Sequence, residues 1–434
     1  MAGAGNRPRR VWILNHYAAA PDRPAGTRHY ALGRAVVRAG GDVTIFAAGF
    51  SHGSGREIRL RRASLVRTQT FGGVRFVWLR TFPYRGNTWR RMVNMASYAV
   101  MVVLAHVGRP VPDVVVGSTV HPFAALAGWF IARLHGARFI FEVRDLWPQT
   151  LIDLGAMRAG SPGARLLGSI EAFLVRQAET VITVLPGMVD YLASRGLPSG
   201  HVRYLPNGVD LADEAATAPL AGLPADPADR LIAQVRARRA AGAVAFVYLG
   251  AHGRVNRLDV VLRAFDAARR RTSVPITLLL VGDGPEKPAL ELQAAALGSD
   301  GVVFADPIAK SRVPDLLDAV DVGVVHVTET PVYRYGVSFN KLFDYMAACL
   351  PVAFACGTAF DQVAASGAGL TVRPDDPDAL AAAFVQLAQA GPESRRRMGE
   401  AGRRFLEREH DMAGIGREFA DLVGCDDGPV APAA

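Results

Sequence analysis

Two series of short, continuous apolar runs pass through the sequence, and a stretch of helical periodicity separates each run from the next. Continuous runs are typical of parallel strands covered by helices on both faces, because half-exposed strands alternate apolar and polar residues. A length of 434 residues suits two such domains. The runs predict strands at 11–14, 42–47, 75–79, 114–118, 138–143, 180–184 and 202–205, then at 245–250, 276–282, 302–305, 322–327, 352–355 and 370–372.

A stretch rich in Ala, Pro and Asp separates the two series. We predict a Rossmann-like domain over 1–210, a linker over 211–235, a second Rossmann-like domain over 236–405, and a C-terminal helix and tail over 406–434 that packs back on the first domain. The expected fold class is α/β, with two doubly wound domains that face each other across a cleft. Ligands in such sheets bind beyond the carboxyl ends of the strands, so the loops after the strands are the candidate sites.

Charge is distributed unevenly along the chain. Residues 1–100 hold 17 Arg, no Lys and 3 acidic residues, whereas the whole chain has a net charge of +9. This excess of positive charge in the first 100 residues favours an anionic partner, such as a phosphate or an anionic membrane surface. Nucleic acid is not expected, because no known binding module accompanies the arginines.

Cysteine use and hydropathy bear on the compartment. Three cysteines, none at metal-ligand spacing, favour a reducing, cytoplasmic setting. We see no signal peptide, and the most apolar stretch, 95–107, is shorter than the roughly 20 residues that span a bilayer. Basic residues at 80–91 precede this stretch, which suits peripheral contact with an anionic membrane; a core helix with a solvated basic rim is the alternative.

Three loops of the first domain carry candidate residues. Gly26 and Thr27 precede a predicted helix, whose free N–H groups favour anions. His121 follows the strand at 114–118, where an imidazole can contact a substrate hydroxyl or phosphate. Arg144 lies among the charged residues that follow the strand at 138–143. An ordinary glycine turn, a structural histidine and surface salt bridges are the alternatives.

The second domain opens with a phosphate-compatible loop. Gly253, Arg254, Asn256 and Arg257 lie between its first strand and the following helix, and they offer backbone N–H groups and guanidinium forks for a diphosphate. Gly282 ends the next strand in a Gly-Asp-Gly-Pro turn. Two such loops after neighbouring strands support each other as a nucleotide site.

A third loop carries one of only three lysines in a chain that has 46 arginines. Ser338, Phe339 and Asn340 would present free N–H groups at a helix start. Lys341 follows them and could meet a phosphate as a compact point charge. Asp344, further along the helix, could accept hydrogen bonds from a ribose diol; an acid that complements the helix dipole is the alternative.

These motifs together resemble the GT-B-fold retaining glycosyltransferases of family 4. The similarity covers nearly the whole chain and is closest to the bacterial branch that builds O-antigen, capsule and exopolysaccharide, including fucosamine-type transferases. It implies transfer of a sugar from a nucleoside diphosphate sugar with retained anomeric configuration, no metal or other cofactor, the donor on the second domain and the acceptor on the first. The motifs that carry it are 26–28, 142–148, 206–210, 282–285 and 338–347.

The resemblance also assigns roles by position. It gives donor ribose recognition to Asp344, and it places the family's first carboxylate at Gly336, where this chain has none. The family's diphosphate-binding lysine falls on Arg257, with Arg254 as a substitute, and its arginine falls on Ala251. The glycine loop matches Gly26, and the cleft histidine that contacts the transferred sugar matches His121.

The predicted function is therefore transfer of a hexosyl or N-acetylhexosaminyl group from a nucleotide sugar, such as a UDP-sugar, to a hydroxyl. The acceptor is expected to be a polyprenyl-linked or other anionic glycan intermediate of cell-surface polysaccharide assembly. A natural-product tailoring glycosyltransferase and a degenerate, non-catalytic sugar-nucleotide binder remain alternatives. An epimerase or hydrolase would need more paired acids than the strand-end loops contain.

Overall fold

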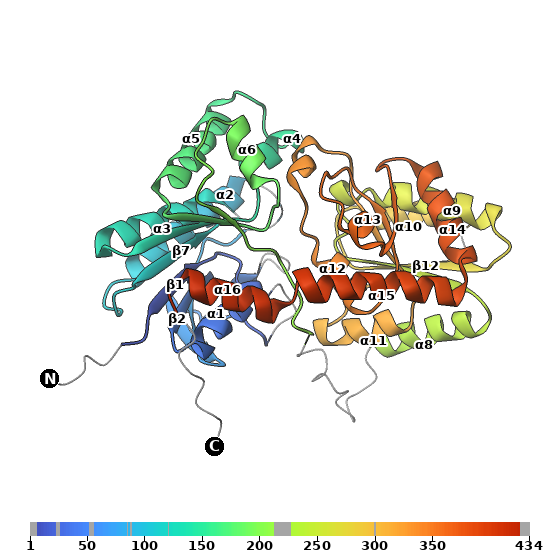
Figure 1. The fold of residues 1–434 in the computed structure, drawn as a ribbon, viewed down its shortest axis with the longest axis horizontal. Coiled ribbons are helices and arrows are strands. Elements are labelled where there is room, and N and C mark those ends of the chain that lie inside the picture. Colours follow the sequence, from blue (N-terminus) through green and yellow to red (C-terminus); the bar gives the residue numbers. More distant parts are fainter. Residues whose placement is uncertain are drawn as a thin grey trace, which may run out of the picture. The chain divides into compact units, whose positions relative to one another are not determined.

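The computed structural model describes residues 7–22, 27–51, 56–84, 86, 89–119, 121–211, 227–298 and 301–425. The chain divides into two compact units (Figure 1): unit 1 comprises Met1–Asn207 with Met412–Ala434, and unit 2 comprises Gly208–Asp411. Each unit is built around one large, mainly parallel sheet. The fold class predicted from the sequence, two α/β domains with parallel sheets, is confirmed.

Unit 1 contains an eight-stranded sheet in the order β10-β9-β8-β7-β1-β2-β6-β5. Every neighbouring pair is parallel except β5 and β6. A separate two-stranded ribbon joins β3 (Phe50–Ser51) and β4 (Arg56–Glu57). The strands of the large sheet are β1 (Arg10–Leu14), β2 (Asp42–Ala48), β5 (Val66–Phe71), β6 (Val74–Leu79), β7 (Val114–Ser118), β8 (Arg138–Val143), β9 (Thr180–Thr183) and β10 (Val202–Tyr204).

Helices cover both faces of this sheet. α1 (Arg28–Arg38) and α16 (Met412–Leu422) pack on each other, and their apolar residues share a core with β1, β2 and β6. α2 (Trp89–Ala105) and α3 (Pro122–His135) also pack together, against β6 and β7 respectively. The remaining helices of unit 1 are α4 (Gln149–Asp153), α5 (Pro162–Gln177) and α6 (Met188–Ser194).

Unit 2 contains a six-stranded parallel sheet in the order β13-β12-β11-β14-β15-β16. Its burial is nearly complete in the central strands, as expected for a sheet covered on both faces. The strands are β11 (Val244–Leu249), β12 (Ile276–Val281), β13 (Val302–Ala305), β14 (Val322–His326), β15 (Val352–Ala355) and β16 (Gly369–Val372).

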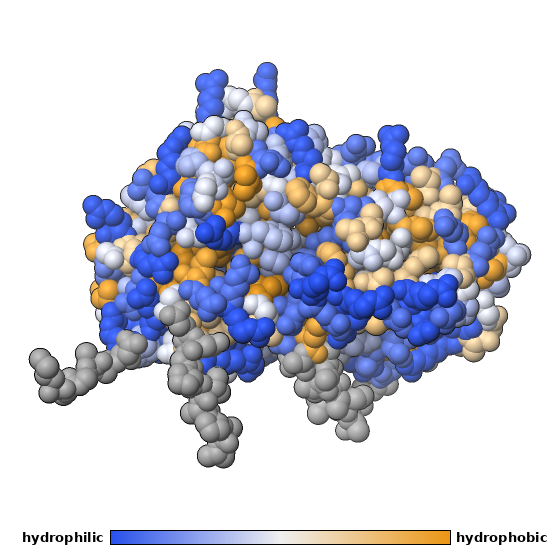
Figure 2. All heavy atoms as spheres, viewed as in Figure 1, coloured by the Kyte–Doolittle hydropathy of each residue, from blue (hydrophilic) through white to orange (hydrophobic). Residues whose placement is uncertain are grey.

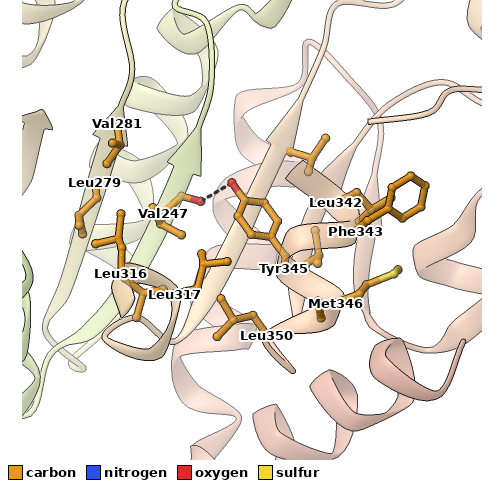
Figure 3. Packing of buried hydrophobic residues seen from close by; sticks show 14 of the residues in the cluster. Val247, Leu279, Val281, Leu316, Leu317, Leu342, Phe343, Tyr345, Met346 and Leu350 are labelled. Carbon is orange, nitrogen blue, oxygen red and sulfur yellow. Dashed lines mark hydrogen bonds between the residues drawn. The ribbon is translucent and has the colours of Figure 1, made fainter. Parts of the chain in front are cut away.

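Two apolar clusters fill the two sides of the unit 2 sheet. One contains residues of α9 (Leu258–Arg271), α10 (Lys287–Ala296) and α14 (Pro377–Gln389). The other contains residues of α8 (Pro227–Ala240), α11 (Val313–Asp318) and α12 (Asn340–Ala347), and Figure 3 shows part of it. α13 (Gln362–Ser366) and α15 (Gly391–Glu409) each add a residue to this second cluster, Val363 and Leu406. Figure 2 shows a hydrophilic strip along α15, where Arg and Glu side chains pair at helical spacing.

All the predicted strands are present, and their ends agree to within one residue. The sequence missed β5, because its polar Arg-Thr-Gln-Thr centre is not an apolar run; it lies antiparallel at the sheet edge and is half exposed. Residues 227–235, which the sequence placed in the linker, instead form the first part of α8 and contribute Ala228, Leu231, Ile232 and Val235 to the core.

The apolar stretch at 95–107 belongs largely to α2. One face of this helix is buried through Asn94, Met95, Tyr98 and Val102, while several large side chains on it are exposed. Among the described helices, none combines the length and apolar character needed to cross a membrane.

Candidate functional site

Lys341 lies on the first turn of α12 and reaches the loop that follows β11. Its Nζ is 3.8 Å from the centroid of the Tyr248 ring. A Cβ added to Gly250 would lie 3.1 Å from the same nitrogen, so the ammonium packs against glycine backbone. Burial lowers the pKa of Lys341 to about 7, and no acidic group among the described residues offsets that effect.

The other two lysines are ion-paired at the same carboxyl edge of the sheet. Lys287 Nζ is 2.6 Å from Asp306 Oδ1. Lys310 Nζ is 2.5 Å from Oδ1 of Asp344, the residue predicted to read ribose. Lys341 is therefore the one lysine whose charge the described protein leaves uncompensated, which is the state expected of a cation that awaits an anionic ligand.

α12 is held against the sheet by Tyr345. Its hydroxyl accepts a hydrogen bond from the Leu249 N–H at 2.9 Å and lies 3.2 Å from the Val247 carbonyl, to which it donates (Figure 3). Gly323 on β14 makes room for the ring, since a Cβ there would lie 2.4 Å from it. These contacts fix Lys341 and Asp344 relative to the end of β11.

The loops after β11 and β12 are in backbone contact. Gly250 and Gly282 have φ of 140° and 152°, and a Cβ on Gly282 would lie 1.9 Å from the Gly250 carbonyl oxygen. The His252 N–H donates to the Asp283 carbonyl at 2.9 Å. Only glycine fits at Gly282, so the predicted phosphate-compatible turn is also a packing requirement.

His252 is a candidate that the sequence reasoning did not select. It is fully buried, and neither ring nitrogen has a hydrogen-bond partner among the described residues. Burial lowers its pKa, and so do Lys287 and Lys341, while Asp283 opposes the shift. Its position two residues after the strand-ending Gly250 was the available signal, and a buried imidazole without partners is a group that a ligand could satisfy.

The predicted diphosphate arginines lie in the same first loop. The Arg257 guanidinium pairs with Asp259 at 2.9 Å and with Asp375 at 3.4 Å, and the hydrogen bond that it donates to Asp259 raises the pKa of Arg257. Arg254 is exposed, and Gly253 begins the short 3₁₀ turn that contains it. The Asn256 side chain donates to the Ala251 carbonyl at 2.9 Å. Arg257 would have to exchange a carboxylate for a phosphate to act on the donor, and its role stays a prediction.

The start of α12 has the predicted form. Phe339 is the N-cap residue, and Ser338 precedes it. Among the described residues, no backbone carbonyl accepts from the N–H groups of Phe339 or Asn340, which leaves these donors for a ligand. Gly336 has a φ of 110°, which side chains rarely adopt, so this backbone explains why no carboxylate occupies that position.

In unit 1, His121 follows β7 and is fully buried. Its Nε2 lies 2.8 Å from Nδ1 of His16, whose ring stacks between Tyr17 and Tyr98. Its Nδ1 has no partner among the described residues. Burial, reinforced by Arg91, lowers the pKa of His121 to about 3, so this imidazole is neutral and can only donate or accept a hydrogen bond.

A buried ion pair links three of the sequence motifs of unit 1. Arg28 Nε donates to Glu142 Oε1 at 3.0 Å and, through its other nitrogens, to the Leu205 and Pro206 carbonyls. His29 Nε2 is 2.5 Å from Glu142 Oε2. Burial would raise the pKa of Glu142, but His29 and Arg28 hold it well below its usual range. These contacts tie the start of α1 to the end of β8 and to the segment that follows β10.

Two of the remaining candidates of unit 1, Thr27 and Arg144, are close to this pair in the sequence. Thr27 is the N-cap residue of α1, without a side-chain capping bond, and Gly26 lies outside the described residues. The Arg144 N–H donates to Thr119 Oγ1 at 2.9 Å, and its buried Nε has no partner in the described part of the chain. The Nε of Arg144 is thus a donor that the described residues leave unsatisfied near the carboxyl edge of the unit 1 sheet.

Two family models match consecutive parts of the chain. One, described as a glycosyl transferase 4-like domain, matches residues 25–208, and the other, described as glycosyl transferases group 1, matches residues 243–390. Together they cover most of both units. The chain belongs to the GT-B glycosyltransferases of family 4.

Individual relatives agree with this assignment. The chain is 24% identical over 358 residues to WcaI of Escherichia coli strain K12, which is named as a colanic acid biosynthesis glycosyl transferase; the match covers 79% of this chain and 81% of WcaI. Sucrose-phosphate synthase from Thermosynechococcus elongatus shares the fold with a TM-score of 0.70 at 18% identity, covering 95% of this chain and 98% of that one. HepE of Anabaena, solved with UDP and glucose, has a TM-score of 0.64 at 15% identity, covering 96% and 99%.

Proposed function

We propose that this glycosyltransferase transfers a sugar from a nucleoside diphosphate sugar to a hydroxyl of a lipid-linked glycan during cell-surface polysaccharide assembly. The observation that carries the donor half is Lys341, a desolvated ammonium without an anionic partner among the described residues, beside two glycine loops at the carboxyl edge of the unit 2 sheet. The name of WcaI, which refers to polysaccharide synthesis, supports the acceptor class.

The donor would bind along this edge. Lys341 and the N–H groups of Phe339 and Asn340 would hold the diphosphate. Asp344 would accept hydrogen bonds from the ribose diol, either in place of its bond from Lys310 or in addition to it. UDP is the nucleotide that we propose, because HepE was solved with UDP. With Gly336 in place of a carboxylate, backbone groups at 337–340 would read the sugar hydroxyls, and a hexosyl or N-acetylhexosaminyl group is the proposed cargo.

Catalysis would depend on the leaving group. Cleavage of the anomeric bond places negative charge on the departing diphosphate, and a preorganised Lys341 stabilises that charge most in the transition state. We propose retention by attack on the same face, in which the leaving phosphate accepts the proton of the acceptor hydroxyl. His121 would act as a neutral hydrogen-bond partner of the sugar, since its pKa of about 3 excludes a charged role at neutral pH. No metal is required in this scheme.

The acceptor would be carried by a polyprenyl diphosphate at the cytoplasmic face of a membrane. The basic front of the chain, with 17 Arg and 3 acids in its first 100 residues, supports an anionic acceptor and peripheral contact with anionic lipid. We propose Arg144 as a contact for an acceptor phosphate, because it follows β8 at the carboxyl edge of the unit 1 sheet and its Nε has no partner among the described residues.

A thermal-shift panel of nucleoside diphosphates and their sugars tests the donor half, since a ligand of the folded state raises Tm by mass action. We expect UDP and at least one UDP-sugar to raise Tm, and Lys341→Ala to reduce the rise. If no nucleotide raises Tm of the wild type, the donor proposal fails.

Incubation of the positive UDP-sugar with a bacterial lipid extract tests transfer. A labelled sugar in the lipid fraction supports the lipid-linked acceptor. Nucleotide binding without turnover on lipid or small-molecule acceptors would identify a non-catalytic binder instead.

A further inference from the structure

A small cavity lies at the amino edge of the unit 1 sheet. Its volume is about 80 Å³, and it is lined by Arg10, Trp12, Asp42, Thr44, Arg75, Arg109 and Pro110. Arg10 and Asp42 begin β1 and β2, so the cavity is at the opposite end of the strands from His16 and His121. Trp12, Thr44 and Arg75 lie in register across β1, β2 and β6 and therefore share one face of the sheet.

The lining carries three guanidinium groups and one carboxylate. Arg75 Nη1 is 3.3 Å from Asp42 Oδ1 and donates to Thr44 Oγ1 at 3.0 Å. Arg109 donates through Nε to the Ala105 carbonyl at 2.8 Å and has no carboxylate partner among the described residues. Among the described residues, the Arg10 guanidinium has no hydrogen-bond partner. Only the Arg10 backbone N–H donates, to the Asp113 carboxylate. The guanidinium groups of Arg10 and Arg109, which have no carboxylate partner among the described residues, line a space small enough to suit a tetrahedral phosphate.

Exposed apolar side chains surround this end of the unit. Arg109 lies between Val107 and Val111, which are 73% and 46% exposed, and the last turn of α2 adds Leu104 at 62%. The C-terminal turn of α3 is close by, because the His135 ring lies 6.5 Å from the Trp12 ring; this part of α3 exposes Phe130 and Leu134. An apolar rim around a cationic cavity matches the boundary between lipid headgroups and acyl chains.

The cavity lining has a net positive charge, because it contains three arginines and one carboxylate, Asp42. A soluble phosphate metabolite would not need an apolar rim, whereas an anionic bilayer offers both phosphate and apolar surface.

We propose that this end of unit 1 is a membrane-docking surface in which Arg10, Arg75 and Arg109 hold the phosphate of an anionic phospholipid while the apolar rim enters the interface. This proposal rests on the proposed function, because docking on a bilayer would bring the enzyme to a lipid-linked acceptor. Lipid binding itself is measured without sugar transfer, so either proposal can fail alone.

Co-sedimentation of the full chain with phosphatidylcholine vesicles, with and without phosphatidylglycerol, tests it. We expect binding that requires phosphatidylglycerol. Arg10→Gln should weaken it about fivefold, the worth of one basic residue near an anionic surface. Val107→Ser should also weaken it. Arg397→Gln on exposed α15 removes the same charge in unit 2 and should leave it unchanged.

The Arg10 side chain makes no hydrogen bond among the described residues, so its loss should not impair folding; an unchanged Tm of the free protein checks this. Equal vesicle binding by the wild type and Arg10→Gln would overturn the proposal. So would an absence of vesicle binding combined with an Arg10-dependent rise in Tm on adding inorganic phosphate, which would identify a site for soluble phosphate.

Discussion

The ammonium of Lys341 lies 3.8 Å from the centre of the Tyr248 ring, and these two residues come from different elements of unit 2. Tyr248 is buried in β11, and its hydroxyl donates to the Ala251 carbonyl at 2.9 Å, so the ring is fixed. The aromatic face offsets part of the cost of burying the charge but supplies no counter-ion. The predictions below follow mainly from this arrangement.

Replacing Lys341 with Ala should lower kcat about 10²-fold or more, because in the proposed mechanism its ammonium stabilises the departing diphosphate. Steady-state kinetics with the UDP-sugar that raises Tm would measure this. Arg397→Ala on the exposed face of α15 is the control. Unchanged turnover with an intact fold would remove Lys341 from the mechanism.

Donor binding should take up a proton at alkaline pH. With a pKa of about 7, Lys341 is mostly neutral in the free protein at pH 8, and a bound diphosphate would restore its charged form. Calorimetric titration of UDP in buffers of different ionisation enthalpy should show uptake of close to one proton at pH 8 and much less at pH 6. The Lys341→Met variant should show no such difference in proton uptake between pH 8 and pH 6. Equal proton uptake by the wild type and the variant at pH 8 would contradict the assignment.

The same lysine should make stability depend on pH. Because its folded pKa is depressed, the cost of the buried charge is fully present below about pH 7 and fades as pH rises toward 10.5, where both states are neutral. Lys341→Met should therefore raise the free energy of unfolding by ~2–4 kcal/mol at pH 6, and the gain should shrink by pH 10. Denaturant titrations at both pH values measure it, and a gain that does not depend on pH would point to packing instead.

Gly282→Ala should disrupt both donor loops, since the new Cβ would meet the Gly250 carbonyl oxygen at 1.9 Å. We expect a lower Tm and a loss of UDP binding greater than the change in Tm explains. Gly298→Ala is the matched control, because Gly298 also has a positive φ but no atom within 4 Å of an added Cβ. Similar UDP affinity in the two variants would show that the loop contact does not shape the site.

Arg28→Met should destabilise the protein by about 3–5 kcal/mol, because it leaves Glu142 charged in the core. Adding Glu142→Gln should recover part of that loss, and Arg38→Met, at the exposed end of α1, should cost little. Urea unfolding of the wild type, Arg28→Met, Glu142→Gln, the double variant and the Arg38→Met control gives the comparison. Strictly additive losses would mean that the two side chains do not interact.

Local sequence determined the elements and their order. Continuous apolar runs predicted the other strands of both sheets, because a strand that is buried on both faces must be apolar throughout. The sequence did not predict β5, because an edge strand can carry polar residues. Strand ends also pointed to the loops at Gly250, Gly282 and Lys341, since parallel strands present their carboxyl ends along one edge.

Side-chain partners were decided only by the tertiary structure. β11 lies between β12 and β14, and this crossover brings Lys341 next to Gly250. Among the described residues, it also leaves the His252 ring buried without a hydrogen-bond partner and pairs Arg257 with Asp375. The cavity at the amino edge likewise draws Arg10, Arg75 and Arg109 from three separate segments. Apolar patterning acts over a few neighbouring residues, whereas the state of a charge depends on which distant groups the sheet order places beside it.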